Sequence, residues 1–260
     1  MTKLLQIKNS SPKNILVYPL YKIKGKEKEY YKHKKFVDKN VQVVEKLNCV
    51  DNVIILEKEV NSWSEMIVDV LYSIKKLLEH NNILFSEADT IFTKEFSEIF
   101  LIEKFMMFSK CEEDSNIDPS FTKDFYLNGG LVYYPSNMNE NLWNFIDDVD
   151  RYDSIKMTGN LYEVIMNRIY YSQFSSLKEG MEYLKIFGIK KYNWCIRSNV
   201  NLEQLKHIHF LNMSHYTSDE SKFSGFWYET FFDRIYNLIM NDHPIDDMVI
   251  DLQNYCDLKI

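Results

Sequence analysis

The chain has 260 residues, of which 45% are hydrophobic and 15% aromatic, and it carries a net charge of −7 at pH 7. This size and apolar content suffice for one large domain with a substantial core, and the few glycines (7) and prolines (5) exclude a disordered or fibrous chain. The negative charge disfavours general nucleic-acid binding, because an acidic surface and a phosphate backbone repel each other.

The 4 cysteines are widely scattered and form no C-x-x-C pair, so the sequence supports neither a zinc knuckle nor a redox dithiol. The N-terminus has no apolar signal core, and no stretch approaches the roughly 20 apolar residues of a membrane span. We therefore expect a cytoplasmic protein with free thiols and without a transmembrane segment.

Strands and helices are predicted to alternate from the start of the chain. An apolar run at 15–18 predicts a strand, and the lysine-rich stretch 22–35 after it is interpreted as a solvated loop and helix face rather than a phosphate-binding surface. Apolar positions within 36–47 then indicate a helix. The continuously apolar run 53–56 predicts a second strand that is buried on both faces.

The next helix is the clearest local prediction. Ser62 and Glu65 form an S-x-x-E capping box, which marks a helix start. Apolar side chains then recur at helical period on one face: Trp63, Met66, Ile67, Val70, Leu71, Ile74, Leu77 and Leu78. A third apolar strand follows at once, beginning at Ile83. This alternation implies βαβ units, a mostly parallel sheet and right-handed crossovers.

Two carboxylates, Glu87 and Asp89, stand at the end of the third strand. In an extended segment, residues i and i+2 point to the same side, so both carboxylates can face one ligand. Parallel sheets bind ligands beyond the carboxyl ends of their strands. Carboxylate oxygens suit Mg²⁺ or Mn²⁺, with water and phosphate oxygens completing the shell. The alternative is that the acidic pair only marks the exit of the strand into a loop.

The rest of the chain is predicted to be mainly helical. Helices are predicted over four segments: 93–105, 137–149, 162–174 and 226–240. A polar loop is predicted at 111–123 and a strand at 125–135. Gly129 and Gly130 lie inside that strand, where paired glycines indicate a bulge or a close approach of backbone to a ligand. No linker divides the chain, so we expect one domain over 1–260.

Four segments, in chain order, resemble glycosyltransferases of the GT-A fold, and particularly the family 8 group that includes glycogenin. I-L-F-S-E-A-D-T-I-F is similar to the metal-binding D-x-D strand end, with Glu87 where Asp is usual. Y-L-N-G-G-L-V-Y-Y-P resembles the F-N-[SG]-G strand. G-N-L-Y-E-V-I-M-N resembles the D-Q-x-x-x-N helix without its acidic-glutamine pair. H-F-L-N-M-S-H-Y resembles H-F-x-G-x-x-K-P-W, with Asn212 in place of Gly and His215 in place of Lys.

The resemblance covers about half of the chain and implies a GT-A (Rossmann-like) α/β fold. This fold has a mixed, mostly parallel central sheet flanked by helices, and a helical C-terminal part is expected. Residues 1–110 would form the nucleotide-binding half, and residues 111–260 the acceptor-side half with the C-terminal helices. The implied activity is metal-dependent, hexosyltransferase-type transfer from a nucleotide-sugar donor, expected to be a UDP-sugar, to a carbohydrate, glycoconjugate or other hydroxyl acceptor.

The resemblance also assigns roles to residues. Asp89, Glu87 and His209 would ligate Mn²⁺ (or Mg²⁺), with Asp89 as the direct ligand and the longer Glu87 in the outer shell or on the ribose of the donor. The expected catalytic residues are Asn128, which would bind the donor sugar, and Asp124, which would face the acceptor. The expected donor-binding residues are Glu87, Ala88, Asp89, Gly129, Gly130, Asn212 and His215.

The residues themselves leave alternatives open. His209 also suits a core histidine satisfied by backbone groups, Asn128 a turn residue, and Asp124 a solvated loop acid. A sugar nucleotidyltransferase would hold Mg²⁺ with paired carboxylates too, although no glycine- and arginine-rich nucleotide loop lies near the first strand. A catalytically degenerate GT-A domain that binds a carbohydrate or a partner is the non-enzymatic alternative, because the H-F-x-N-x-x-H-Y segment is altered.

Overall fold

The computed structural model describes residues 12–110, 125–138, 161–187, 194–195, 205–210 and 225–257. The strands are β1 (Lys13–Ile23), β2 (Asn52–Val60), β3 (Asn81–Ser86), β4 (Thr90–Phe92), β5 (Met106–Lys110), β6 (Leu127–Tyr134), β7 (Trp194–Cys195) and β8 (His207–His209). The helices are α1 (Glu27–Leu47), α2 (Trp63–Leu78), the 3₁₀ helix η1 (Ser97–Leu101), α5 (Leu161–Ser172), α6 (Leu177–Phe187), α7 (Gly225–Met240) and α8 (Asp246–Asp257).

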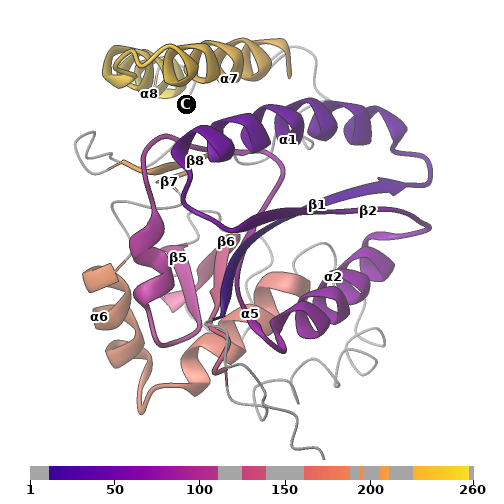
Figure 1. Cartoon of the computed structure of the whole chain (residues 1–260), viewed down its shortest axis with the longest axis vertical. Helices are drawn as coiled ribbons and strands as arrows, with labels where there is room; N and C mark the ends of the chain where they lie inside the picture. Colours follow the sequence, from indigo (N-terminus) through magenta and orange to yellow (C-terminus); the bar gives the residue numbers. More distant parts are fainter. Residues whose placement is uncertain are drawn as a thin grey trace, which may run out of the picture.

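A five-stranded sheet in the order β2-β1-β3-β6-β5 forms the centre of the molecule (Figure 1). β1 pairs in parallel with both β2 and β3, whereas β6 runs antiparallel to β3 and to β5. Within this sheet, β6 runs antiparallel to the other four strands. The predicted fold class, a mixed and mostly parallel sheet flanked by helices, is confirmed. The chain moves from β1 outward to β2 and then back across to β3, so a topological switch point lies between β1 and β3.

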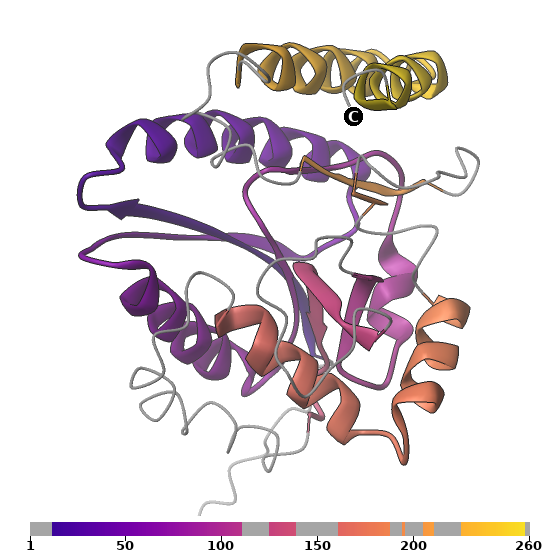
Figure 2. The ribbon, with the colours of Figure 1, turned by 180° about the vertical axis from the view of Figure 1, so that it is seen from behind.

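The helices cover both faces of the sheet. α1 lies over one face, and α2 and α5 lie over the other (Figures 1 and 2). α7 and α8 form a further layer outside α1, where the ring of Phe232 in α7 packs 4.3 Å from that of Phe36 in α1. A smaller sheet in the order β4-β8-β7 follows directly from the end of β3. The described chain ends in the two helices α7 and α8, so its C-terminal part is helical, as predicted.

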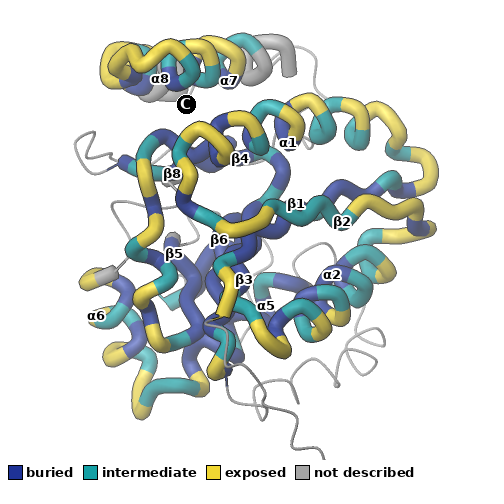
Figure 3. Tube along the Cα trace, in the orientation of Figure 1, coloured by how far each residue is buried: buried dark blue, intermediate teal, exposed yellow. Residues whose placement is uncertain are grey.

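Burial follows this layering (Figure 3). Every residue of β6 is buried, as expected for a strand with a helix on one face and two strand neighbours. The prediction that the strand at 53–56 is buried on both faces is wrong, because β2 lies at the edge of the sheet and these four residues are only partly buried. No helix in the described segments has both the length and the apolar character needed to cross a membrane.

Several element boundaries agree with the sequence and others do not. Helix α2 begins after Ser62, whose hydroxyl accepts a hydrogen bond from the Glu65 amide at 3.1 Å, so the predicted N-cap is confirmed. The Glu65 carboxylate accepts from the Asn61 amide at 2.7 Å, one residue before the position that a capping box predicts. The helices predicted at 162–174 and 226–240 correspond to α5 and α7, and α1 begins earlier than predicted, within the lysine-rich stretch. The sequence did not predict α6 or α8. The loop at 111–123 and the helix at 137–149 lie outside the described residues, apart from the first two positions of that helix.

The helix predicted at 93–105 is wrong. The structure has a single 3₁₀ turn, η1, followed by an extended run into β5. The aromatic side chains that suggested one helical face pack separately instead: the ring of Phe96 stacks 4.1 Å from Phe92, while Phe105 meets Tyr134 at 5.1 Å. The separate packing of these rings and the pairing of Met106–Lys110 with β6 override the local helical periodicity.

Candidate metal centre

A tight turn connects β3 to β4 and carries both predicted carboxylates. β3 ends at Ser86, so Glu87 and Asp89 flank the turn and do not extend the strand. The Thr90 hydroxyl donates to the Glu87 carbonyl at 2.8 Å and closes the turn. The two carboxylates do face one point, but the turn brings them together, and the i, i+2 alternation of an extended strand is not the cause.

Three neighbouring elements hold the backbone of this turn. The Glu87 amide donates to the Gly130 carbonyl of β6 at 2.9 Å, and the Phe210 amide donates to the Asp89 carbonyl at 2.8 Å. From α1, the buried Asn40 side chain donates to the Thr90 carbonyl. A turn whose backbone is fixed from three sides gives the two carboxylates a preorganised base, which favours a binding site.

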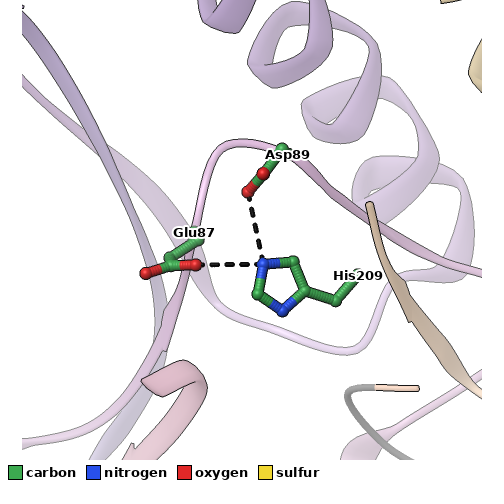
Figure 4. Close-up of side chains that lie close together, drawn as sticks. All are labelled: Glu87, Asp89 and His209. Atoms are coloured by element: carbon green, nitrogen blue, oxygen red, sulfur yellow. Dashed lines mark ion pairs between the residues drawn. The ribbon is translucent and has the colours of Figure 1, made fainter. Parts of the chain in front are cut away.

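The third member of the site arrives from the far end of the sequence. β8 pairs antiparallel with β4 so that His209 lies opposite Thr90, next to the turn. His209 Nε2 lies 3.0 Å from Glu87 Oε2 and 3.5 Å from Asp89 Oδ1 (Figure 4). The His209 side chain is 2% exposed, whereas those of Asp89 and Glu87 are 15% and 38% exposed. The site is thus closed beneath the imidazole and opens on the Glu87 side.

These three side chains suit a divalent cation. One ligand atom from each lies within 4.8 Å of the others. Adjacent ligands of an octahedral Mg²⁺, bound at about 2.1 Å, stand about 3 Å apart, close to the two distances from His209 Nε2. Two carboxylates and one imidazole nitrogen form a donor set that could hold a divalent cation. Because Glu87 reaches the imidazole at least as closely as Asp89, the geometry is compatible with both carboxylates as direct ligands.

Electrostatics keep the deepest carboxylate ionised. Burial alone raises the pKa of Asp89, but the charge and hydrogen bond of His209, together with the charge of His33 in α1, outweigh it and lower the pKa below its ordinary value. The pKa of His207, two residues before His209, is shifted downward, whereas an ion pair with a carboxylate would raise it. Burial, and secondarily the charge of His209, lower its pKa well below 6.5, so its ring is neutral at pH 7.

The Asn128-Gly129-Gly130 segment lies next to this turn but is occupied by contacts within the protein. The Asn128 side chain donates to Glu163 at 3.0 Å and accepts from the Gly130 amide at 2.9 Å. A Cβ atom on Gly129 would stand 3.0 Å from the ring of Tyr162. The absence of a side chain at Gly129 therefore makes room for α5. The predicted contacts of these residues with a donor sugar stay predictions.

Two polar residues of α5, Glu163 and Asn167, contact β6 although neither was predicted as a site residue. The Asn167 amide accepts from the Leu127 amide and donates to the Leu127 carbonyl, both at 2.8 Å, and Glu163 contacts Gly129 and Asn128. The sequence signal for these contacts was the E-x-x-x-N spacing on a largely apolar helix, because residues i and i+4 lie on the same helical face.

The other predicted site residues divide into two groups. Ala88 is buried in the turn, between the two carboxylates in sequence. Asp124, Asn212 and His215 lie outside the described residues, so their predicted roles stay predictions.

Known proteins resemble this chain only weakly. No family model matches the chain, and no curated protein matches it. Among solved structures, the chain is similar to one described as the crystal structure of a glycosyltransferase involved in the glycosylation of the major capsid of PBCV-1. The sequence identity is 8%, the alignment covers 85% of this chain and 100% of that one, and the TM-score is 0.49. At that similarity, the function of the chain has to be inferred from the geometry of its own site.

Proposed function

We propose that the chain is a metal-dependent GT-A glycosyltransferase of the family 8 type, which transfers a sugar from a nucleotide-diphosphate sugar to a hydroxyl acceptor. The observation that carries the proposal is the convergence of Glu87, Asp89 and His209 at the carboxyl end of β3. This position adjoins the switch point between β1 and β3, where open α/β sheets bind their ligands. The order of the four sequence segments supports the same assignment.

The residues of the site fit the chemistry of this transfer. A divalent cation bound there supplies Lewis acidity to the diphosphate that leaves the sugar. Asp89 offers a carboxylate oxygen that lies 3.5 Å from His209 Nε2. Glu87, the most exposed of the three, faces the open side from which a donor would approach. His209 offers a nitrogen lone pair only when its ring is neutral, so protonation of His209 opposes metal binding.

The finer parts of the proposal concern substrates and the two halves of the chain. A UDP-sugar is the proposed donor, and a carbohydrate or glycoconjugate the proposed acceptor. Residues 1–110, which hold the turn and the switch point, would bind the nucleotide, and residues 111–260 would bind the acceptor. Asn128 would contact the sugar and Asp124 the acceptor. We propose Mn²⁺ (or Mg²⁺) as the cofactor and the cytoplasm as the location.

A thermal-shift screen of nucleotide sugars with and without Mn²⁺ tests the proposal. A ligand at one hundred times its dissociation constant stabilises the native state by about 2.7 kcal/mol. We expect a stabilisation by UDP-sugars that requires Mn²⁺ and is lost in Asp89→Asn and His209→Gln. Asp69→Asn serves as the matched control, because Asp69 pairs with Lys58 and Tyr21 away from the turn. Equal binding by wild type, Asp89→Asn and His209→Gln would show that the metal centre is wrong.

Product analysis of the same samples separates the alternatives. Mn²⁺-dependent release of a nucleoside diphosphate supports the glycosyltransferase. Release of pyrophosphate identifies a sugar nucleotidyltransferase, and Mn²⁺-dependent binding of nucleotide sugars without any release identifies a degenerate domain that acts as a binding module.

A further inference from the structure

The carboxylate of Glu163, on α5, accepts two hydrogen bonds from β6 through a single oxygen. Glu163 Oε1 lies 3.0 Å from Asn128 Nδ2 and 3.1 Å from the Gly129 amide nitrogen. Glu163 itself is half-buried. Two hydrogen bonds to one acceptor oxygen tie the N-G-G segment to α5.

The hydrogen bonds continue from this anchor to the metal-centre turn. The Gly130 amide donates to Asn128 Oδ1 at 2.9 Å, and the Gly130 carbonyl accepts from the Glu87 amide at 2.9 Å. A connected path therefore leads from Glu163 through Asn128 and Gly130 to the backbone of Glu87. Each step uses a group that has a definite donor or acceptor role, so a shift at one end displaces the next group.

Strand pairing is interrupted where this path crosses β6. Between the Met107–Val132 and Ser109–Asn128 pairs, the register of β5 and β6 shifts, so residues 129–131 of β6 lie opposite Phe108 alone. On the other side, the β3 pairing ends at Ser86 opposite Leu131. An irregular segment with fewer ladder bonds needs another anchor to keep its shape, and a side-chain carboxylate supplies it.

The ring of Tyr162 lies beside both Gly129 and Phe85, two residues before Glu87. Burial raises the pKa of Tyr162, the hydrogen-bonded Tyr134 raises it further, and the charges of Glu87 and Glu163 add to the effect. The Tyr162 ring reaches this position because Gly129 has no side chain. The α5 contact and the turn are therefore neighbours in space as well as along the hydrogen-bond path.

We propose that Glu163 is a positioning residue for the metal centre, which fixes the backbone of Glu87 through Asn128 and Gly130 by means of one hydrogen-bonding oxygen. This inference rests on the proposed function, because it takes the Glu87-Asp89-His209 cluster as a divalent-cation site. The role depends on the acceptor oxygen of Glu163 and not on its charge. A glutamine at this position retains that oxygen, whereas an alanine removes it.

Binding of Mn²⁺ alone, measured by electron paramagnetic resonance of free Mn²⁺ in titrations of the intact chain, tests the inference without any substrate. Removal of groups that orient metal ligands typically weakens metal affinity about 10- to 100-fold, and we expect a loss of this order for Glu163→Ala. We expect Glu163→Gln to restore the affinity to within about threefold of wild type, since it preserves the acceptor. Asn128→Ala, which breaks the middle of the path, should match Glu163→Ala, and the double variant should lose no more than either single one.

Asn167→Ala is the matched control. Asn167 makes two hydrogen bonds from the same helix to the same strand, but to Leu127, which is not on the path to Glu87. We expect it to lower the unfolding temperature and leave Mn²⁺ affinity unchanged. The inference is overturned if Glu163→Ala binds Mn²⁺ like wild type, if Glu163→Gln loses as much as Glu163→Ala, or if Asn167→Ala loses as much affinity. A wild-type chain that binds no Mn²⁺ would instead overturn the metal-dependent function itself.

Discussion

Two histidines on the same face of β8 illustrate how environment decides the role of a side chain. His209 faces Glu87 and Asp89, so its ring nitrogen meets two negative oxygens. His207 packs edge-on against Phe92, with ring centroids 4.6 Å apart, and its Nε2 lies 3.2 Å from the Ser86 hydroxyl. Within the described segments His207 Nδ1 has no hydrogen-bond partner. A buried ring among such neighbours is stable only when neutral.

His207 should make the stability of the fold depend on pH. Its pKa is lowered well below 6.5 in the folded state by burial, so below pH 6.5 the unfolded chain binds a proton that the folded chain does not. The free energy of unfolding should therefore fall as the pH drops from 7.5 to 5.5, by up to about 1.4 kcal/mol per pH unit for this one group. Urea unfolding of wild type and His207→Gln at both values measures it. Equal pH dependence of the two proteins would contradict the prediction.

At the scale of elements, the contact between α5 and β6 shapes the site more than either element alone. Tyr162 and Glu163 lie against Gly129, and the Tyr162 hydroxyl is 3.0 Å from that of Tyr134 in β6. Asn167 pairs with the backbone of Leu127 at the start of the strand. Asn167 therefore fixes the start of β6, whereas the hydrogen bonds of Glu163 lead through Asn128 and Gly130 to the turn after β3.

Gly129→Ala should destabilise this contact. The added Cβ would stand 3.0 Å from Tyr162 Cε1 and 3.2 Å from Glu163 Cγ, closer than ordinary van der Waals contact. Overpacking of this kind typically costs about 1–3 kcal/mol of unfolding free energy, which urea titration can measure. The Tyr162→Leu background provides the control, because a smaller side chain should reduce the cost of the same substitution. An undiminished cost there would show that the Tyr162 ring is not the cause.

At the scale of the whole molecule, helix α7 supports the candidate metal centre from outside. Phe232 in α7 is fully buried and packs 5.5 Å from Phe210, the residue after His209, as well as against Phe36. The Phe210 amide in turn binds the Asp89 carbonyl. Lys46 of α1 donates to the carbonyls of Ile239 and Met240 at the end of α7 and so joins the two layers. Through Phe210, helix α7 thus supports the turn that carries Asp89, which lies more than a hundred residues earlier in the chain.

Phe232→Ala should weaken both the fold and the site. Loss of a buried phenylalanine typically costs about 3–5 kcal/mol. Because the cavity would lie beneath Phe210, we also expect Mn²⁺ affinity to fall about tenfold, measured well below the unfolding temperature. Val249→Ala, which also removes a fully buried side chain but in α8, is the control. If both variants bind Mn²⁺ equally well, the layer formed by α7 has no influence on the centre.

The amino-acid sequence by itself determined the alternation of strands and helices up to the turn after β3, the capped start of α2 and the acidic pair Glu87 and Asp89. These features are local, since periodic burial, a cap and a short spacing are written within a few neighbouring residues. His209 entered the site prediction only through a family resemblance, because nothing near it in the sequence marks it as a ligand.

The tertiary structure alone decided that β5 is a strand, that a three-residue β8 pairs with β4, and that Glu163 anchors β6. Such short strands bury little surface by themselves and form only where a partner edge is available, which depends on residues far away in the chain. The candidate metal centre, too, was decided by the tertiary structure. Its carboxylates are neighbours in sequence, but the imidazole that completes it comes 120 residues after Asp89 and is placed by strand pairing.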